Sequence, residues 1–173
     1  MASGKPVVRQ VAWLSILPQL LIMVTIVIIF TLLIERFITA LTVAMITYLA
    51  ISNILERGIP RNHRKGVLLS KKGDYLHAIE EFQKSYDFFT KHSWIDKYRY
   101  ITLLSSSRIP YTEMSLVNIA FCYAQTGERD LAKHYYKKAL ELFPDSEMAK
   151  SALNMIATLE NGPSNSANKR DES

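Results

Sequence analysis

The chain has 173 residues, enough for one modest domain with an appendage. A net charge of +5, without a dense basic stripe carrying interleaved aromatic residues, argues against a nucleic-acid-binding protein. A single cysteine, Cys122, excludes an intramolecular disulfide and fits a reducing compartment. Charge is unevenly spread, because residues 10–55 hold only one Glu and one Arg. The chain therefore divides into an apolar first third and a charged remainder.

Two long apolar runs follow the short segment of residues 1–10. Trp13–Ile34 is 22 residues without a charge, and Phe37–Leu55 is 19 more. A helix that crosses the hydrocarbon core of a bilayer needs about 20 apolar residues. The charged pair between the runs, Glu35 and Arg36, marks the point where the chain reverses. We therefore predict two transmembrane helices within residues 11–56, joined as a tight hairpin.

Other interpretations of the apolar runs fit less well. A cleaved signal peptide has an apolar core of about 7–15 residues, and here the first run is too long and a second follows at once. A buried pair in a soluble protein would need a larger remaining domain. A single crossing followed by a helix on the membrane surface stays open, because polar residues soften the second run. They are Thr39, Thr42, Thr47, Ser52 and Asn53.

Basic residues flank both runs and predict the orientation. Lys5 and Arg9 precede the first run. Six basic residues follow the second and are also candidate contacts for lipid headgroups: Arg57, Arg61, Arg64, Lys65, Lys71 and Lys72. Because positive charge favours the cytoplasmic side, an integral membrane protein with both termini and its charged domain in the cytoplasm is expected.

Small residues recur on one face of the second run. Ala40, Ala44 and Thr47 lie at i, i+4 and i+7, which permits close approach of another helix. The first helix of the same hairpin is the simplest partner, and self-association is the alternative.

Residues 115–144 show the pattern of two helices around a turn. Their first apolar face comprises Leu116, Ile119, Ala120 and Tyr123. Gly127 breaks the helix, and Pro144 closes a second helix whose apolar face comprises Ala132, Tyr136, Ala139 and Leu140. This spacing resembles the tetratricopeptide repeat, a helix–turn–helix unit of 34 residues, over residues 113–146.

A second copy of the pattern lies upstream, at about residues 59–92. It matches at Gly66, Leu69, Gly73, Asp74, Ala78, Phe82 and Ser85. After Pro144, residues 146–160 form an amphipathic helix that would cap the array, with Asp145 or Ser146 as its N-cap. The fold class is therefore all-α, a transmembrane hairpin followed by a short repeat-like array over residues 57–160, with a disordered polar tail at 161–173.

The two copies are separated by an insert, residues 93–112. Trp94, Tyr98 and Ile101 lie at i, i+4 and i+7 and predict a further helical turn or two. An aromatic stripe at this spacing usually packs under its own fold, so burial is the prediction. A contact surface for another molecule is the alternative.

No group of residues has the spacing of a catalytic or metal site. The histidines (His63, His77, His92 and His134) have no carboxylate or cysteine at metal-ligand spacing. Cys122 is expected to be a packed thiol, and nucleotide-binding and nucleophile motifs are missing from the sequence. We therefore predict a protein that is not an enzyme and holds no metal or cofactor.

The resemblance implies that the array binds a protein or peptide along its concave surface. The candidate partner groove comprises Met114, Val117, Asn118, Phe121, Met148, Ala152 and Met155. It lacks the basic residues that a carboxylate clamp needs, and its methionines suit varied partners. The insert could equally fill this groove.

The predicted function is a membrane-anchored adaptor, assembly factor or accessory subunit that binds proteins on the cytoplasmic face. The partners are a protein or peptide and the lipid bilayer, and not a nucleic acid. The alternative is a small subunit of a membrane or transport complex in which the hairpin is the working part.

Overall fold

The computed structural model describes residues 16–103 and 107–160, most of which are helical. The predicted N-terminal segment 1–10, the start of the first apolar run and the tail 161–173 lie outside these residues. The chain forms two compact units, residues 1–65 with 84–112 and residues 66–83 with 113–173. The helices of the described residues are α1 (Ile16–Leu33), α2 (Phe37–Gly58), α3 (Arg61–Lys71), α4 (Tyr75–Lys91), α5 (Ser93–Lys97), α6 (Arg99–Thr102), α7 (Tyr111–Gln125), α8 (Arg129–Leu142) and α9 (Glu147–Glu160).

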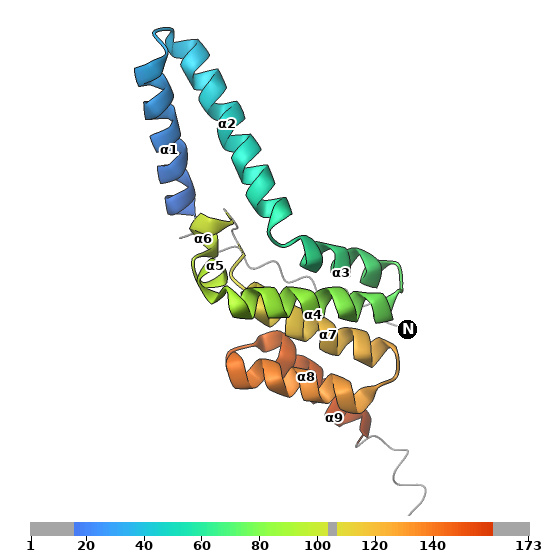
Figure 1. The fold of residues 1–173 in the computed structure, drawn as a ribbon. Coiled ribbons are helices and arrows are strands. Elements are labelled where there is room, and N and C mark those ends of the chain that lie inside the picture. The colour runs from blue at the N-terminus through green and yellow to red at the C-terminus, as the bar shows by residue number, and fades with distance from the viewer. Residues whose placement is uncertain (1–15, 104–106, 161–173) are drawn as a thin grey trace, which may run out of the picture. The chain divides into compact units, whose positions relative to one another are not determined.

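In the first unit, α1 and α2 form the predicted helical hairpin (Figure 1). The chain reverses over residues 34–36, where Arg36 has an extended backbone with φ −88° and ψ 106°. Ala40 and Ala44 are 0% and 1% exposed, so the small face of α2 is buried as predicted. Because these side chains end at Cβ, the two helices can contact one another closely.

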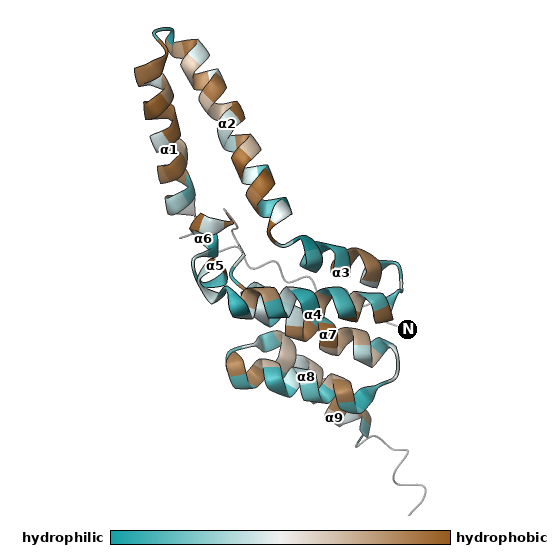
Figure 2. Cartoon of the chain, in the orientation of Figure 1, coloured by the Kyte–Doolittle hydropathy of each residue, from teal (hydrophilic) through white to brown (hydrophobic). Residues whose placement is uncertain are grey.

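Most exposed side chains of the hairpin are large and apolar, and much of α1 and α2 is brown, the colour of hydrophobic residues, in Figure 2. Leu32 and Ile38 are 82% and 79% exposed, whereas the fully buried residues of α2 are two alanines, Ala40 and Ala44. The hydroxyls of Thr25 and Thr42 donate hydrogen bonds of 2.8 Å to carbonyls of their own helices. Among the described residues, α2 alone is long and apolar enough to cross a membrane, and the apolar part of α1, Leu17–Leu33, is shorter.

The rest of the first unit packs around a small aromatic cluster. Phe89, Ile95 and Leu103 are buried together, with Ile59, Phe88 and Tyr111 against them. The rings of Phe89 and Tyr111 stack with centroids 4.8 Å apart. Ile59 directly follows α2, and α6 contacts α1. Both legs of the hairpin are therefore attached to residues 88–103.

The core of the second unit joins the second half of α3, the first half of α4, and α7. Ala78 and Phe82 of α4 pack with Ile119 and Cys122 of α7. Gly66 of α3 lies so close to Phe82 that a Cβ built on the glycine would be 2.8 Å from the ring. The small residue predicted at this repeat position is therefore required by the approach of two helices.

The predicted faces of α7 and α8 are confirmed. Leu116, Ile119, Ala120, Ala132 and Ala139 are fully buried. Helix α8 ends at Leu142, two residues before Pro144. The Oγ of Ser146 accepts a hydrogen bond of 3.5 Å from the amide of Ala149, which makes Ser146 the N-cap of α9.

The same turn closes the first helix of both helix pairs. Gly73 and Gly127 have φ +82° and +87°, a conformation that glycine adopts without a Cβ penalty. In both turns the following amide bonds back to the carbonyl five residues earlier, Asp74 to Leu69 and Glu128 to Tyr123. These bonds define the Schellman motif, so one sequence pattern produces one structure twice.

Candidate functional site

The predicted partner groove draws four of its residues from α7. Met114, Val117, Asn118 and Phe121 lie at i, i+3, i+4 and i+7, along one face of the helix. Val117 is buried and the other three are half-buried. Phe121 presents its ring edge-on to Tyr75 of α4, with centroids 6.3 Å apart. One side of Phe121 is therefore used in packing between helices, and the remainder faces outward.

The other three groove residues lie on α9. Met148 and Ala152 are half-buried, whereas Met155 is 67% exposed. Ala149 is buried and α9 contacts α8, so α9 is anchored along one face and presents Met155 and Leu159 on another. The accessible apolar surface of the predicted groove thus increases towards the end of α9.

The six basic residues proposed as headgroup contacts are all exposed. In α3, Arg64 and Lys65 lie about one helical turn after Arg61, and the exposed Leu68 continues the same face. The opposite face of α3 holds the buried His63 and Gly66. Helix α3 is therefore amphipathic, with its basic residues displayed on the outside.

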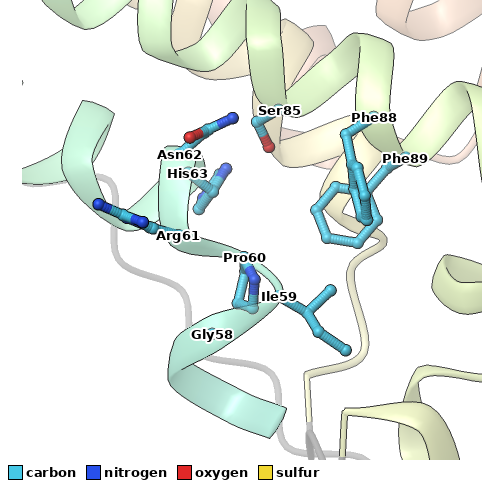
Figure 3. A pocket seen from close by; sticks show the side chains of 9 residues that line it. All are labelled: Gly58, Ile59, Pro60, Arg61, Asn62, His63, Ser85, Phe88 and Phe89. Atoms are coloured by element: carbon cyan, nitrogen blue, oxygen red, sulfur yellow. The ribbon is translucent and has the colours of Figure 1, made fainter. Parts of the chain in front are cut away.

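A cavity of about 220 Å³ lies where α2 passes into α3 (Figure 3). Pro60 and His63 face Phe88 and Phe89 across it, and Ser85 lies at its edge. This volume is below the 300–1,000 Å³ of typical small-molecule sites. The cavity is a small gap beside the aromatic cluster.

His63 is buried, and burial lowers its pKa from 6.5 to about 4. Its ring meets that of Tyr111 edge-on, with centroids 5.3 Å apart. The unfolded chain binds a proton on His63 more readily than the folded chain does. The contribution of this residue to folding stability is therefore fully present above pH 6.5, and it is lost as the pH falls from there through about 4. His63 is therefore a neutral packing residue at physiological pH.

Cys122 is unsuited to nucleophilic chemistry. Its side chain is fully buried, and burial raises the pKa of its thiol to about 11, against a smaller lowering by a hydrogen bond with Ser70. At neutral pH almost none of it is the reactive thiolate. Within residues 16–103 and 107–160, no group of three His, Cys, Asp or Glu side chains could hold a metal ion.

The prediction that the aromatic stripe of the insert is buried was wrong. Trp94, Tyr98 and Ile101 are 58%, 52% and 53% exposed. The buried face of the insert is formed instead by Ile95, Asp96, Arg99 and Leu103. Two charged residues occupy the inside because they bond to the later part of the insert, residues 107–112.

Asp96 and Arg99 hold the insert in place, and no pattern in the sequence marks either residue. The carboxylate of Asp96 accepts hydrogen bonds from the amides of Tyr111 and Thr112 at 2.8 and 2.9 Å, and from the Thr112 hydroxyl at 2.7 Å. Arg99 donates to the carbonyls of Ser107 and Arg108. Asp96 therefore caps the start of α7 from a distance of 15 residues in sequence.

Helix–turn–helix pairs with small residues at their contacts define a helical-repeat protein. Models of the tetratricopeptide repeat match residues 60–89 and 114–146. The helix pairs α3 with α4 and α7 with α8 are therefore similar to tetratricopeptide repeats, and the predicted resemblance is confirmed at both places. Such repeats are typically non-catalytic modules that bind proteins. No curated protein and no solved structure matched the chain.

Proposed function

We propose that this protein is a membrane-anchored adaptor, assembly factor or accessory subunit without catalytic activity. The hairpin α1–α2 crosses the bilayer, and the two repeats bind a protein partner on the cytoplasmic face. The observation that carries the proposal is the combination of two protein-binding repeats with a hairpin whose large side chains point outward.

The hairpin is suited to lipid in both its surface and its hydrogen bonds. Large aliphatic side chains on its outside would be costly in water, where exposed apolar patches are seldom so extensive. The hydroxyls of Thr25, Thr31 and Thr42 are bonded to carbonyls of their own helices, so these three side chains do not require water. At 1.5 Å per residue, the 18 residues of α1 and 22 of α2 span roughly 27 and 33 Å, against about 30 Å of hydrocarbon.

Cysteine labelling tests this topology. Ser3→Cys and Asn165→Cys, each in a Cys122→Ala background, should both resist a membrane-impermeant thiol reagent in intact cells. Glu35→Cys, at the turn of the hairpin, should be labelled and serves as the control. Labelling at residue 3 or 165 would contradict the placement of both termini in the cytoplasm.

The partner surface is assigned to the outward faces of α7 and α9. Half-buried Met114 and exposed Met155 offer flexible, polarizable side chains that adapt to different apolar partners. Co-purification of the full chain from mild detergent, followed by mass spectrometry, would identify the partner. Met155→Asp should weaken its capture, whereas Glu141→Asp, a conservative change at an exposed position of α8, should not.

Truncation separates the adaptor from the alternative function. A fragment of residues 57–173, checked for helical content by circular dichroism, should still capture the partner if the repeats bind it. Loss of the complex from a helical fragment would instead favour a small membrane subunit in which the hairpin is the working part.

We further propose that the basic face of α3 lies against anionic headgroups. Each Lys or Arg near such a leaflet contributes about 1 kcal/mol of attraction. The helical fragment 57–173 should sediment with anionic vesicles at low salt and dissociate as salt rises. Arg64→Ala with Lys65→Ala should reduce sedimentation more than Lys137→Ala with Glu141→Ala. Equal sedimentation with neutral vesicles would refute electrostatic docking and leave the basic residues as a topology signal.

A further inference from the structure

The exposed stripe of the insert has the composition of a membrane-interface anchor. Trp94 and Tyr98 combine a large apolar ring with one polar atom, and Ile101 adds an aliphatic side chain. Amphipathic rings of this kind concentrate where hydrocarbon meets headgroups. A hydrogen bond of 3.0 Å from the amide of Tyr98 to the carbonyl of Trp94 sets these two residues one helical turn apart. The three residues are called the aromatic patch below.

The charge around the aromatic patch favours the same surroundings. Between residues 93 and 103 the charged residues are Asp96, Lys97 and Arg99. Asp96 and Arg99 are buried in hydrogen bonds, so Lys97 is the exposed charge of this segment. Its amine lies 5.5 Å from the centroid of the Tyr98 ring. A cation beside exposed aromatic rings suits an interface with anionic lipid.

The hairpin fixes where this patch lies along the membrane normal. Within the first unit, α6 contacts α1, and Figure 1 shows it beside the end of α1 farthest from the hairpin turn. Ile59, directly after α2, packs on the cluster of Phe89, Ile95 and Leu103. The insert is thus attached to both legs at the open end of the hairpin. In a membrane-spanning hairpin, that end lies at the cytoplasmic boundary of the hydrocarbon.

We propose that the aromatic patch inserts into the headgroup–acyl boundary of the bilayer that the hairpin crosses. This proposal rests on the membrane hairpin proposed above. Helix α6, which carries Ile101, contacts α1, and Leu17 and Leu21 are exposed at the same end of α1. The interfacial anchor fixes the first unit on the membrane surface, in addition to the two crossings. The aromatic patch is thus covered by lipid and not by a protein partner.

Tryptophan fluorescence of the full chain in lipid vesicles tests this directly. The chain has two tryptophans, so Trp13→Phe leaves Trp94 as the sole emitter. In vesicles of mixed neutral and anionic phospholipid, we expect Trp94 to lose fluorescence to lipids brominated high on the acyl chain. We also expect it to resist quenching by aqueous iodide. Quenching by iodide without quenching by bromolipid would overturn the proposal. Resistance to both would also overturn it, because the patch would then be covered by protein.

Two further variants keep the test specific. Ile101→Asp should reduce bromolipid quenching of Trp94, whereas Leu142→Asp, at a residue of α8 that is 52% exposed, should not change it. A tryptophan at the middle of α2, from Ile46→Trp in a chain lacking Trp13 and Trp94, reports on the hairpin separately. Quenching of that tryptophan without quenching of Trp94 would refute the interfacial anchor and leave the membrane hairpin intact. If neither is quenched, the hairpin itself is not in the lipid.

Discussion

Gly66→Leu is expected to destabilise the repeat region by about 2 kcal/mol or more. A Cβ at position 66 already falls 2.8 Å from two ring atoms of Phe82, a residue that is 1% exposed and packed in the core of the second unit. Overpacking of this kind typically costs about 1–3 kcal/mol. Leucine favours helix over glycine by up to about 1 kcal/mol, which offsets only part of the clash. The clash therefore outweighs the gain in helix propensity, and the variant is expected to be less stable than the original chain.

Thermal unfolding of the full chain in mild detergent, followed by circular dichroism, measures this effect. Gly58→Leu is the matched control, because nothing lies within 4 Å of a Cβ at that position. It should leave the melting temperature unchanged or raise it slightly. Hydrogen exchange should place the destabilisation of Gly66→Leu in residues 66–83 and 113–160. Equal melting temperatures for the two variants would contradict the close approach of α3 to α4.

Gly66 belongs to the part of the fold that local sequence could predict. The positions of small residues and turn glycines follow from helix geometry, since close helix approach and positive φ each admit few residue types. Ala132, Ala139, Gly73 and Gly127 are accordingly where the repeat pattern predicts them. The reversal at residues 34–36 follows from the single charged break in a long apolar stretch.

The buried face of the insert, in contrast, could not be predicted from local sequence. The spacing of Trp94, Tyr98 and Ile101 predicts a shared helical face but does not state which face is buried. That choice is made by Asp96 and Arg99, whose partners lie at residues 107–112. A buried charge is stable only when it is well bonded, and contacts across 8–16 residues leave no periodic pattern to detect.

The exposure of the predicted groove residues likewise follows only in part from the sequence. Repeat position predicts which face of α7 and α9 points outward, but exposure depends on packing against neighbouring helices. Val117 is buried and Phe121 contacts Tyr75, whereas Met155 is largely free. The groove residues are still a prediction as a binding surface, with Met155 its most accessible member.

Asp96→Ala is expected to lower the stability of the folded chain by roughly 3 kcal/mol. The substitution removes an acceptor from two backbone amides at the start of α7 and from the Thr112 hydroxyl. Loss of a helix cap costs about 0.5–2 kcal/mol, and a buried donor left without a partner costs a further 1–3 kcal/mol. A carboxylate at a helix N-terminus also interacts favourably with the helix dipole, an interaction that alanine lacks.

A graded series of variants ties the effect of Asp96 to capping. Asp96→Asn keeps one side-chain oxygen and should lose less stability than alanine, and Thr112→Val, which removes only the 2.7 Å hydroxyl bond, should lose least. Thermal unfolding ranks the stability losses of the three variants, and hydrogen exchange shows which part of the chain is destabilised. The amides of Tyr111 and Thr112 should exchange faster in Asp96→Ala, with little change in α8. Because Asp96 also orients the insert that carries Trp94, the same variant should weaken bromolipid quenching of that tryptophan. Unchanged exchange at residues 111 and 112 would show that the start of α7 is held by other groups.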